Sequence, residues 1–236
     1  MSFRKRAAMM FVVALGVTGG LWAQRPGGGM GMMGNMPSMP GLSNPVIGSG
    51  AEYQMTTKKN GKDMDMDVTT VILGKEEVDG APGLWMEQRM SNAELGGEMV
   101  TKTLMVTEGP QIGIKRMIMQ YPGRPPMEMT GMMMSMMQQH QPQSTQTPSG
   151  GKGDRGELVG MESVTVPAGT FSAQHYRKQE EKGPVDTWIS TDVSPYAMVK
   201  MTRGDMTMVL KKILTNETSH IKGEPVKMQM PQMPQR

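Results

Sequence analysis

The sequence predicts a mostly β protein, formed as one antiparallel meander with a Met/Gln/Pro-rich insertion and disordered termini. Short segments alternate apolar and polar residues, as residues 63–68 do, which is typical of a strand with one buried face. Turn-forming sequences such as Asn60-Gly61 and Pro167-Ala168-Gly169 lie between them. No helical pattern alternates with these segments, so a parallel α/β sheet is excluded.

Ten segments carry the alternation that predicts strands. They are residues 52–56, 63–68, 84–90, 98–107, 111–121, 157–166, 170–179, 185–190, 196–202 and 206–214. We expect them to form one antiparallel β domain over residues 49–222. Residues 122–156 interrupt the pattern with the pair Pro125-Pro126, seven methionines and a Gln/Pro/Ser-rich run. This composition predicts a mobile insertion, and its methionine part is also compatible with a short helix.

Residues 1–23 have the pattern of a secretory signal peptide. Three basic residues at positions 4–6 precede an apolar run over residues 7–17, and the small residue Ala23 predicts cleavage between Ala23 and Gln24. The apolar run is shorter than the roughly 20 residues of a transmembrane helix, which makes an uncleaved anchor the weaker alternative. We expect a periplasmic or secreted protein without a stable membrane anchor.

The two ends of the expected mature chain have low complexity. Residues 24–48 consist mostly of Gly, Met and Pro, and residues 223–236 are rich in Pro, Gln and Met. Such segments bury too little apolar surface to offset the entropy of ordering them. We therefore predict a disordered lead-in and a disordered tail.

Charge and cysteine content exclude several function classes. The chain has 25 basic and 22 acidic residues, and the leader holds three of the basic ones, so 22 of each remain after cleavage. A neutral chain lacks the basic surface that binds nucleic acid. Since the chain has no cysteine, we expect no disulfide, no thiolate chemistry and no lipid-modified N-terminal cysteine.

Two motif-like segments lack the context that their chemistry needs. Residues 29–34 match G-x-G-x-x-G, but the strand and helix of a dinucleotide site do not flank them. The three aspartates of residues 63–67 open like a calcium loop, yet Val68 stands where the loop needs Gly and Gly74 where it needs Glu. On a strand these aspartates line one solvated face.

No catalytic constellation is visible around the three histidines, His140, His175 and His220. The chain has no H-E-x-x-H, no G-x-S-x-G and no P-loop lysine motif. His175 lies in a predicted strand, where it either acts as a base beside Glu180 or Glu181 or has a structural role. Since no nucleophile pairs with it, we predict no catalytic residues and no enzymatic activity.

Methionine has two expected uses in this chain, which holds 32 methionines and only three phenylalanines. Within the strands it fills the core and makes it soft and adaptable. A further fifteen methionines fall in the Gly/Pro-rich lead-in, the insertion and the tail. Thioethers in such segments are candidate ligands for Cu(I).

One group of side chains is the candidate copper site. If residues 132–140 are helical, Met133, Met136, Met137 and His140 lie on one helix face and present three thioethers and an imidazole. The same spacing also describes an apolar stripe that covers the sheet. Copper is the one cofactor that the sequence suggests, and otherwise we expect none.

The second half of the chain resembles a known group of exported proteins. The resemblance rests on the segments ESVTVPAGTF (162–171), HYR (175–177), DTWIS (186–190) and YAMVKM (196–201). Together they resemble exported bacterial proteins with V-P-A-G-T-F, W-I-S and G-L-V-K segments, which look related to the periplasmic lipoprotein-carrier superfamily of localisation-factor half-barrels. The match covers residues 156–214, with weaker support over residues 51–121. Ala197 departs from it, because such proteins often have Gly there.

The resemblance implies a single curved antiparallel sheet, half-barrel-like, whose concave side holds an acyl chain or an apolar peptide. No functional residue is carried over with it. The residues themselves leave a groove and a closed core as equal alternatives, with Met206, Met208 and Leu210 on the strand face that distinguishes them. The predicted function is a non-catalytic envelope domain that binds a lipid or apolar ligand. The alternative is a methionine-rich copper-binding protein of the periplasm.

Overall fold

The computed structural model describes residues 41–59, 61–108, 111–129, 131, 155–180 and 183–228. Its strands are β1 (Gly50–Lys59), β2 (Lys62–Val78), β3 (Ala81–Asn92), β4 (Gly97–Glu108), β5 (Gln111–Gln120), β6 (Met127–Met129), β7 (Glu157–Val166), β8 (Gly169–Glu180), β9 (Gly183–Ile189), β10 (Met198–Arg203), β11 (Met206–Leu214) and β12 (Val226–Lys227). They form a single sheet in the order β12-β6-β5-β4-β3-β2-β1-β11-β10-β9-β8-β7. The predicted mostly β fold with one antiparallel sheet is confirmed.

The order follows from short hairpins joined by one long-range pairing. Neighbours in sequence pair antiparallel from β1 to β6 and from β7 to β11. β1 then pairs with β11, which brings Gly50 opposite Leu214 and joins the two halves. β12 adds to β6 in parallel at one edge. Among the described residues, no helical segment has the length and apolar character of a membrane span.

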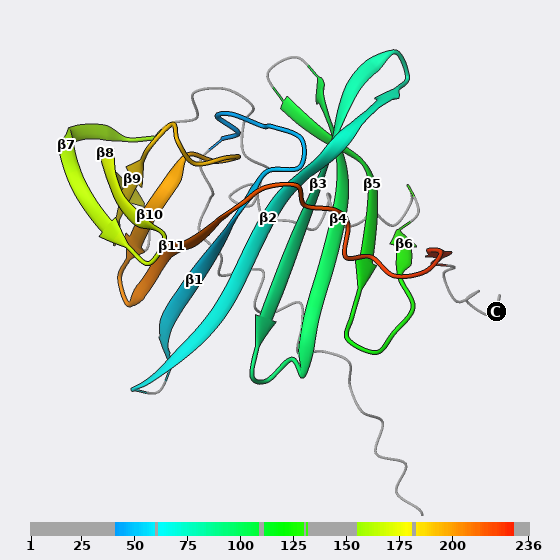
Figure 1. Ribbon diagram of the computed structural model, residues 1–236, viewed down its shortest axis with the longest axis horizontal. Helices are drawn as coiled ribbons and strands as arrows, with labels where there is room; N and C mark the ends of the chain where they lie inside the picture. The colour runs from blue at the N-terminus through cyan, green and yellow to red at the C-terminus, as the bar shows by residue number, and fades with distance from the viewer. Residues whose placement is uncertain are drawn as a thin grey trace, which may run out of the picture. The chain divides into compact units, whose positions relative to one another are not determined.

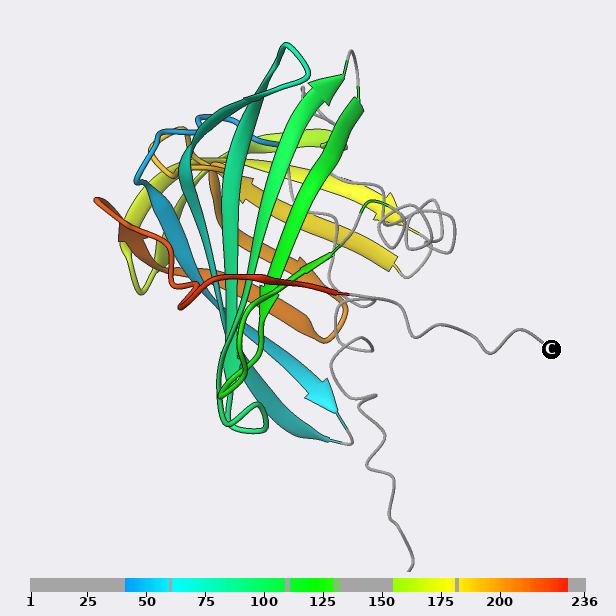
Figure 2. The ribbon, with the colours of Figure 1, turned by 90° about the vertical axis from the view of Figure 1, so that its right-hand side faces the viewer.

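The sheet is strongly curved, and its two faces differ. Figure 2 shows β8–β11 running at a steep angle to the long strands β2–β5. The sheet curls toward the face that carries Met86. A contact across this face shows the direction: the Tyr196 hydroxyl of the β9–β10 turn donates to the Met86 sulfur at 3.2 Å. On the same face the Tyr53 hydroxyl donates to the Met198 carbonyl at 3.1 Å. We call this face the inner face and the opposite one the outer face.

Three elements differ from the sequence prediction. β2 continues to Val78, whereas the predicted strand ends at Val68. The apolar and polar alternation stops after Val68, because both faces of the strand are covered beyond that residue. Val71 and Ile72, which point to opposite faces, are both fully buried, so this part of β2 is a continuous apolar run. The short strands β6 and β12 lie in the predicted insertion and tail, where two or three residues are too few to show a period.

Ala197 has an unusual backbone conformation for a residue other than glycine. Ala197 lies in the turn before β10 with φ at 58°, in the left-handed region that favours glycine. Its amide donates to the Val193 carbonyl at 2.8 Å and its carbonyl accepts from Ser190 at 2.7 Å, so the turn is held in this conformation. Alanine is strained there because its Cβ crowds the following carbonyl.

Replacing Ala197 with glycine tests this strain. We expect Ala197→Gly to raise the free energy of unfolding by about 1 kcal/mol, since relief of left-handed strain exceeds the entropy that glycine adds to the unfolded chain. Urea denaturation of both proteins measures the difference. A glycine placed at Ala173, which is buried in β8 without positive φ, is the control and lowers stability instead. A destabilised Ala197→Gly protein would show that the turn carries no strain.

The chain between β11 and β12 crosses the outer face of the long strands as an extended strap, residues 215–225 (Figure 1). Near its beginning, the Glu217 amide donates to the Gly48 carbonyl. Directly after its end, the Val226 amide donates to the Pro126 carbonyl. Ile221 of the strap packs against the apolar cluster of Trp85, Leu104 and Ile118. The strap therefore covers the middle of the outer face.

A buried carboxylate holds the centre of the strap. Glu87 of β3 is fully buried and accepts hydrogen bonds from the Ser219 hydroxyl at 2.6 Å and the His220 amide at 2.9 Å. It also pairs with Arg89 at 3.0 Å, and Arg89 in turn pairs with Glu217 at 2.8 Å. A buried charge is tolerated only when it is paired and hydrogen-bonded, and this network provides both.

Removing that charge should detach the strap. We expect Glu87→Gln to lower the free energy of unfolding by about 3 kcal/mol, because Arg89 loses a buried partner and an acceptor becomes a donor. Glu98→Gln is the control: Glu98 pairs with His220 of the same strap at 2.8 Å but is 40% exposed, so about 0.5 kcal/mol is expected. Urea denaturation compares the two, and equal losses would show that Glu87 is not the anchor.

Candidate functional site

Methionines line the inner face of the sheet. Met201, Met208, Met55 and Met66 are direct cross-strand neighbours on β10, β11, β1 and β2. Their exposed fractions are 1%, 0%, 7% and 6%, so this part of the inner face is closed. Unbranched thioether side chains fill it, which makes a core that adapts easily to changes of shape.

The residues chosen to distinguish a groove from a core lie in this closed part. Met206, Met208 and Leu210 follow each other on the inner face of β11, with exposed fractions of 8%, 0% and 0%. A charge placed at any of them would be buried without a partner. Over β11, the inner face is core.

Farther along the sheet the inner face is more open. Met119 and Met127, opposite each other on β5 and β6, are half-buried, and so is Met117 beside them. Gln88 on β3 is also half-buried and lies on the same face as Met86. These half-buried side chains are partly reachable by solvent, whereas most of their neighbours on the same face of β3 and β4 are buried.

A mostly buried polar row lies beside these half-buried side chains. Thr70, Gln88 and Thr101 are direct neighbours on β2, β3 and β4, and Met119 continues the row on β5. Thr70 is 0% exposed and Thr101 is 4% exposed, and neither hydroxyl has a hydrogen-bond partner. Buried hydroxyls in folded proteins nearly always have a partner, so these two mark an unmet hydrogen-bonding demand. We call Thr70, Gln88 and Thr101 the inner polar row.

A second polar group, on the outer face of β7–β9, surrounds His175. Its Nδ1 lies 2.8 Å from a Glu162 oxygen and its Nε2 lies 2.6 Å from an Asp186 oxygen. The ring stacks on Trp188 with centroids 4.4 Å apart, and the Trp188 indole N–H donates to Glu162 at 2.6 Å. Arg177 completes the group by donating to Asp186 at 2.8 Å.

These partners differ from the ones that the sequence suggested for His175. Glu180 instead lies 3.6 Å from Arg203, and Glu181 lies outside the described residues. Glu162 and Asp186 reach His175 because β7 and β9 flank β8, an arrangement that sequence spacing alone does not show. Both ring nitrogens face carboxylates, so His175 links the three strands β7, β8 and β9.

The two carboxylates of this group have lowered pKa values. Hydrogen bonds from Trp188 and then from His175 lower the pKa of Glu162. For Asp186, burial alone would raise the pKa, but hydrogen bonds from Arg177 and His175 outweigh it and lower the pKa. Both groups are therefore anionic at neutral pH, as their partners require.

The candidate copper ligands Met133, Met136, Met137 and His140 lie outside the described residues, so that site stays a prediction. In the part of the chain that the structure describes, no cluster of His, Asp and Glu is arranged to hold a metal ion. The aspartates of the rejected calcium loop are engaged differently. Asp65 accepts from the Thr56 hydroxyl at 2.6 Å, and Asp67 pairs with Lys211 at 3.0 Å.

Comparison with known proteins adds three loosely similar structures. One is described as an exported protein with a YmcC-like fold from Bacteroides fragilis, with 14% identity over 74% of this chain and 99% of that one, and a TM-score of 0.31. Another is described as a lipoprotein from Parabacteroides distasonis, with 9% identity, 75% and 99% coverage and a TM-score of 0.33. The third is a DUF1329 family protein from Desulfovibrio piger, with 13% identity, 71% and 85% coverage and a TM-score of 0.33.

No family model matches the sequence, and no curated protein matches it either. With TM-scores of 0.31 to 0.33, the three structures do not identify a ligand, a partner or an activity of this chain. The resemblance to lipoprotein carriers therefore stays a prediction.

The lowered pKa values predict an acid-sensitive group around His175. Carboxylates with lowered pKa stabilise the folded state when ionised, and this contribution is complete above their ordinary values of 4.5 for Glu162 and 3.8 for Asp186. It is lost as pH falls through the lower folded-state values. We therefore expect the free energy of unfolding to fall below about pH 4, and to fall less in a Glu162→Gln/Asp186→Asn variant.

Urea denaturation at a series of pH values from about 2.5 to about 7, which spans the ordinary carboxyl pKa values, measures this dependence. Glu157→Gln serves as the control, because Glu157 is exposed on the same strand as Glu162. Parallel pH profiles for the wild type and the double variant would contradict a stabilising role for the two carboxylates.

Proposed function

We propose that this chain is an exported, non-catalytic binding protein of the cell envelope, and that it binds an apolar ligand with a hydrogen-bonding group on its inner face. One observation carries the proposal: two buried hydroxyls without partners, on Thr70 and Thr101, flank the half-buried Gln88 within a methionine-lined surface. Export rests on the signal-peptide pattern of residues 1–23.

The energetics favour a ligand at this row. An unsatisfied buried hydroxyl costs about 1–3 kcal/mol, and valine would fill the same space without that cost. A ligand carbonyl, carboxyl or hydroxyl that reaches Thr70 or Thr101 would give that hydroxyl the partner it lacks. Ligand sites commonly combine a mostly apolar wall with a few such polar groups.

The surrounding methionines suit the apolar part of the ligand. Met117, Met119 and Met127 extend the surface from the inner polar row toward β6 and are only half-buried. Flexible thioethers repack around ligands of varied shape, as they do on other promiscuous binding surfaces. A fatty acyl chain or a comparable apolar tail fits this description.

Two probes test the proposal. A fluorescent fatty acid carries both an apolar chain and a carboxyl group, whereas diphenylhexatriene is a hydrocarbon of similar length. We expect saturable binding of both by the wild-type chain. In Thr70→Val/Thr101→Val, the Kd of the fatty acid should rise about tenfold, since two hydrogen bonds of about 0.5–1.5 kcal/mol are lost, while the Kd of diphenylhexatriene stays the same.

The control is Thr69→Val, which changes a half-buried threonine on the outer face of the same strand. It should leave both affinities unchanged. If the wild-type chain binds neither probe, the proposed function is wrong. If the double variant binds both probes as the wild type does, the inner polar row is not the site.

A further inference from the structure

One edge of β2 has no partner near its beginning. β2 starts at Lys62, but its pairing with β3 starts only where Asp67 faces Ser91. Residues 62–66 pair with β1 on their other side. Within the described chain, no strand occupies the β3 side of these five residues, so their backbone N–H and C=O groups there remain available for pairing.

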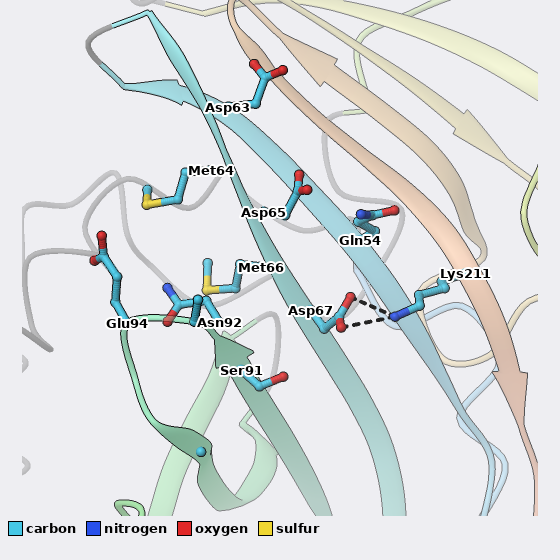
Figure 3. Close-up of a pocket in the computed structure, with 12 residues that line it drawn as sticks. Gln54, Asp63, Met64, Asp65, Met66, Asp67, Ser91, Asn92, Glu94 and Lys211 are labelled. Carbon is cyan, nitrogen blue, oxygen red and sulfur yellow. Dashed lines mark hydrogen bonds and ion pairs between the residues drawn. The ribbon is translucent and has the colours of Figure 1, made fainter.

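A hollow of about 590 Å³ lies beside this free edge. Figure 3 shows it between the beginning of β2 and the end of β3 with the turn that follows, which contribute Asn92 and Glu94. The hollow therefore lies in line with β3, at the position where a continued β3 would run. Its size and place suit a short extended chain.

Side chains of two kinds alternate along the free edge. Asp63, Asp65 and Asp67 point to one side of β2, and Met64 and Met66 point to the other, toward Asn92 and Glu94 (Figure 3). In an antiparallel pair, each residue contacts the side chain directly opposite on the same face. A strand added here would thus meet carboxylates and thioethers in alternation.

The hollow is acidic. Four of its lining residues are acidic, and Lys211 is its single basic one. Lys211 is occupied by Asp67 and by Glu52, at 3.0 Å and 2.9 Å. Lys58 stands opposite Asp63 on β1, but no ion pair joins them in the described structure. Negative charge is therefore left over for a cationic partner.

We propose that residues 62–66 bind an extended segment of another protein in which basic and apolar residues alternate. The segment adds to β2 as a strand in line with β3, places its basic side chains beside Asp63 and Asp65, and places its apolar side chains on the face of Met64, which is half-buried there. Backbone hydrogen bonds provide the affinity, and the alternation provides the specificity, as in other cases of strand addition. This surface is on β2 and is independent of the inner polar row.

A short peptide tests the proposal on the full chain. Fluorescein-labelled Lys-Val-Lys-Val-Lys, capped at both ends, has the expected alternation, and Glu-Val-Glu-Val-Glu has the opposite charge. Fluorescence anisotropy should show saturable binding of the lysine peptide alone. In Asp63→Asn/Asp65→Asn its Kd should rise at least about tenfold, whereas Glu77→Gln, an exposed change near the far end of β2, should alter it less than about twofold.

N-methylated peptides separate strand addition from simple charge attraction. Alternate residues of a strand direct their amide N–H groups to the same neighbour. We therefore compare one peptide methylated on its lysine amides with another methylated on its valine amides. One of the two should lose binding, because its methyl groups block the hydrogen bonds to β2, and the other should still bind. Equal binding of both methylated peptides would overturn the proposal, because charge alone would then explain the affinity. So would an unchanged Kd in the Asp63→Asn/Asp65→Asn variant, or no binding of the lysine peptide to the wild-type chain.

Discussion

The outer face of the sheet depends on one buried carboxylate. Glu87 lies at the middle of β3, and the strap reaches it from the C-terminal side of β11. Without a charge at this point, Ser219 and the His220 amide would lose their shared acceptor, and Ile221 would no longer be held over Trp85 and Leu104. The inner face is covered differently, because the sheet curls over part of it and Tyr196 reaches Met86 there. One polar contact thus holds the segment that covers the outer side of the long strands.

Much of this architecture could be predicted from local patterns. Alternation and turn residues indicate the antiparallel hairpins, because both signals arise from neighbouring residues. The joining of β1 to β11 could not be predicted, since it pairs residues such as Gly50 and Leu214 that no local signal connects. The strap was also missed: residues 215–225 are polar and irregular, and their fixed position depends on partners in β3 and β5.

The candidate sites were predicted less well, for a related reason. The inner polar row consists of one residue from each of three strands, so only the register brings Thr70, Gln88 and Thr101 together. The partners of His175 were misassigned because Glu162 and Asp186 lie in the flanking strands and not beside it in sequence. The three aspartates of β2 were visible as one face of a strand, but the missing neighbour that makes this edge a surface was not.

The central position of β1 has a consequence for the order in which the protein is completed. β1 is made early, yet one of its two neighbours, β11, is among the last strands of the chain. The hairpins from β1 to β6 can form as soon as they are synthesised, but their free β1 edge and uncovered Trp85 cluster wait for residues 206–225. Pairings this distant in sequence form slowly and leave apolar surface exposed meanwhile. The last part of the chain to arrive is therefore the part that closes the structure, and a chain cut before β11 would keep an open edge at the centre of its sheet.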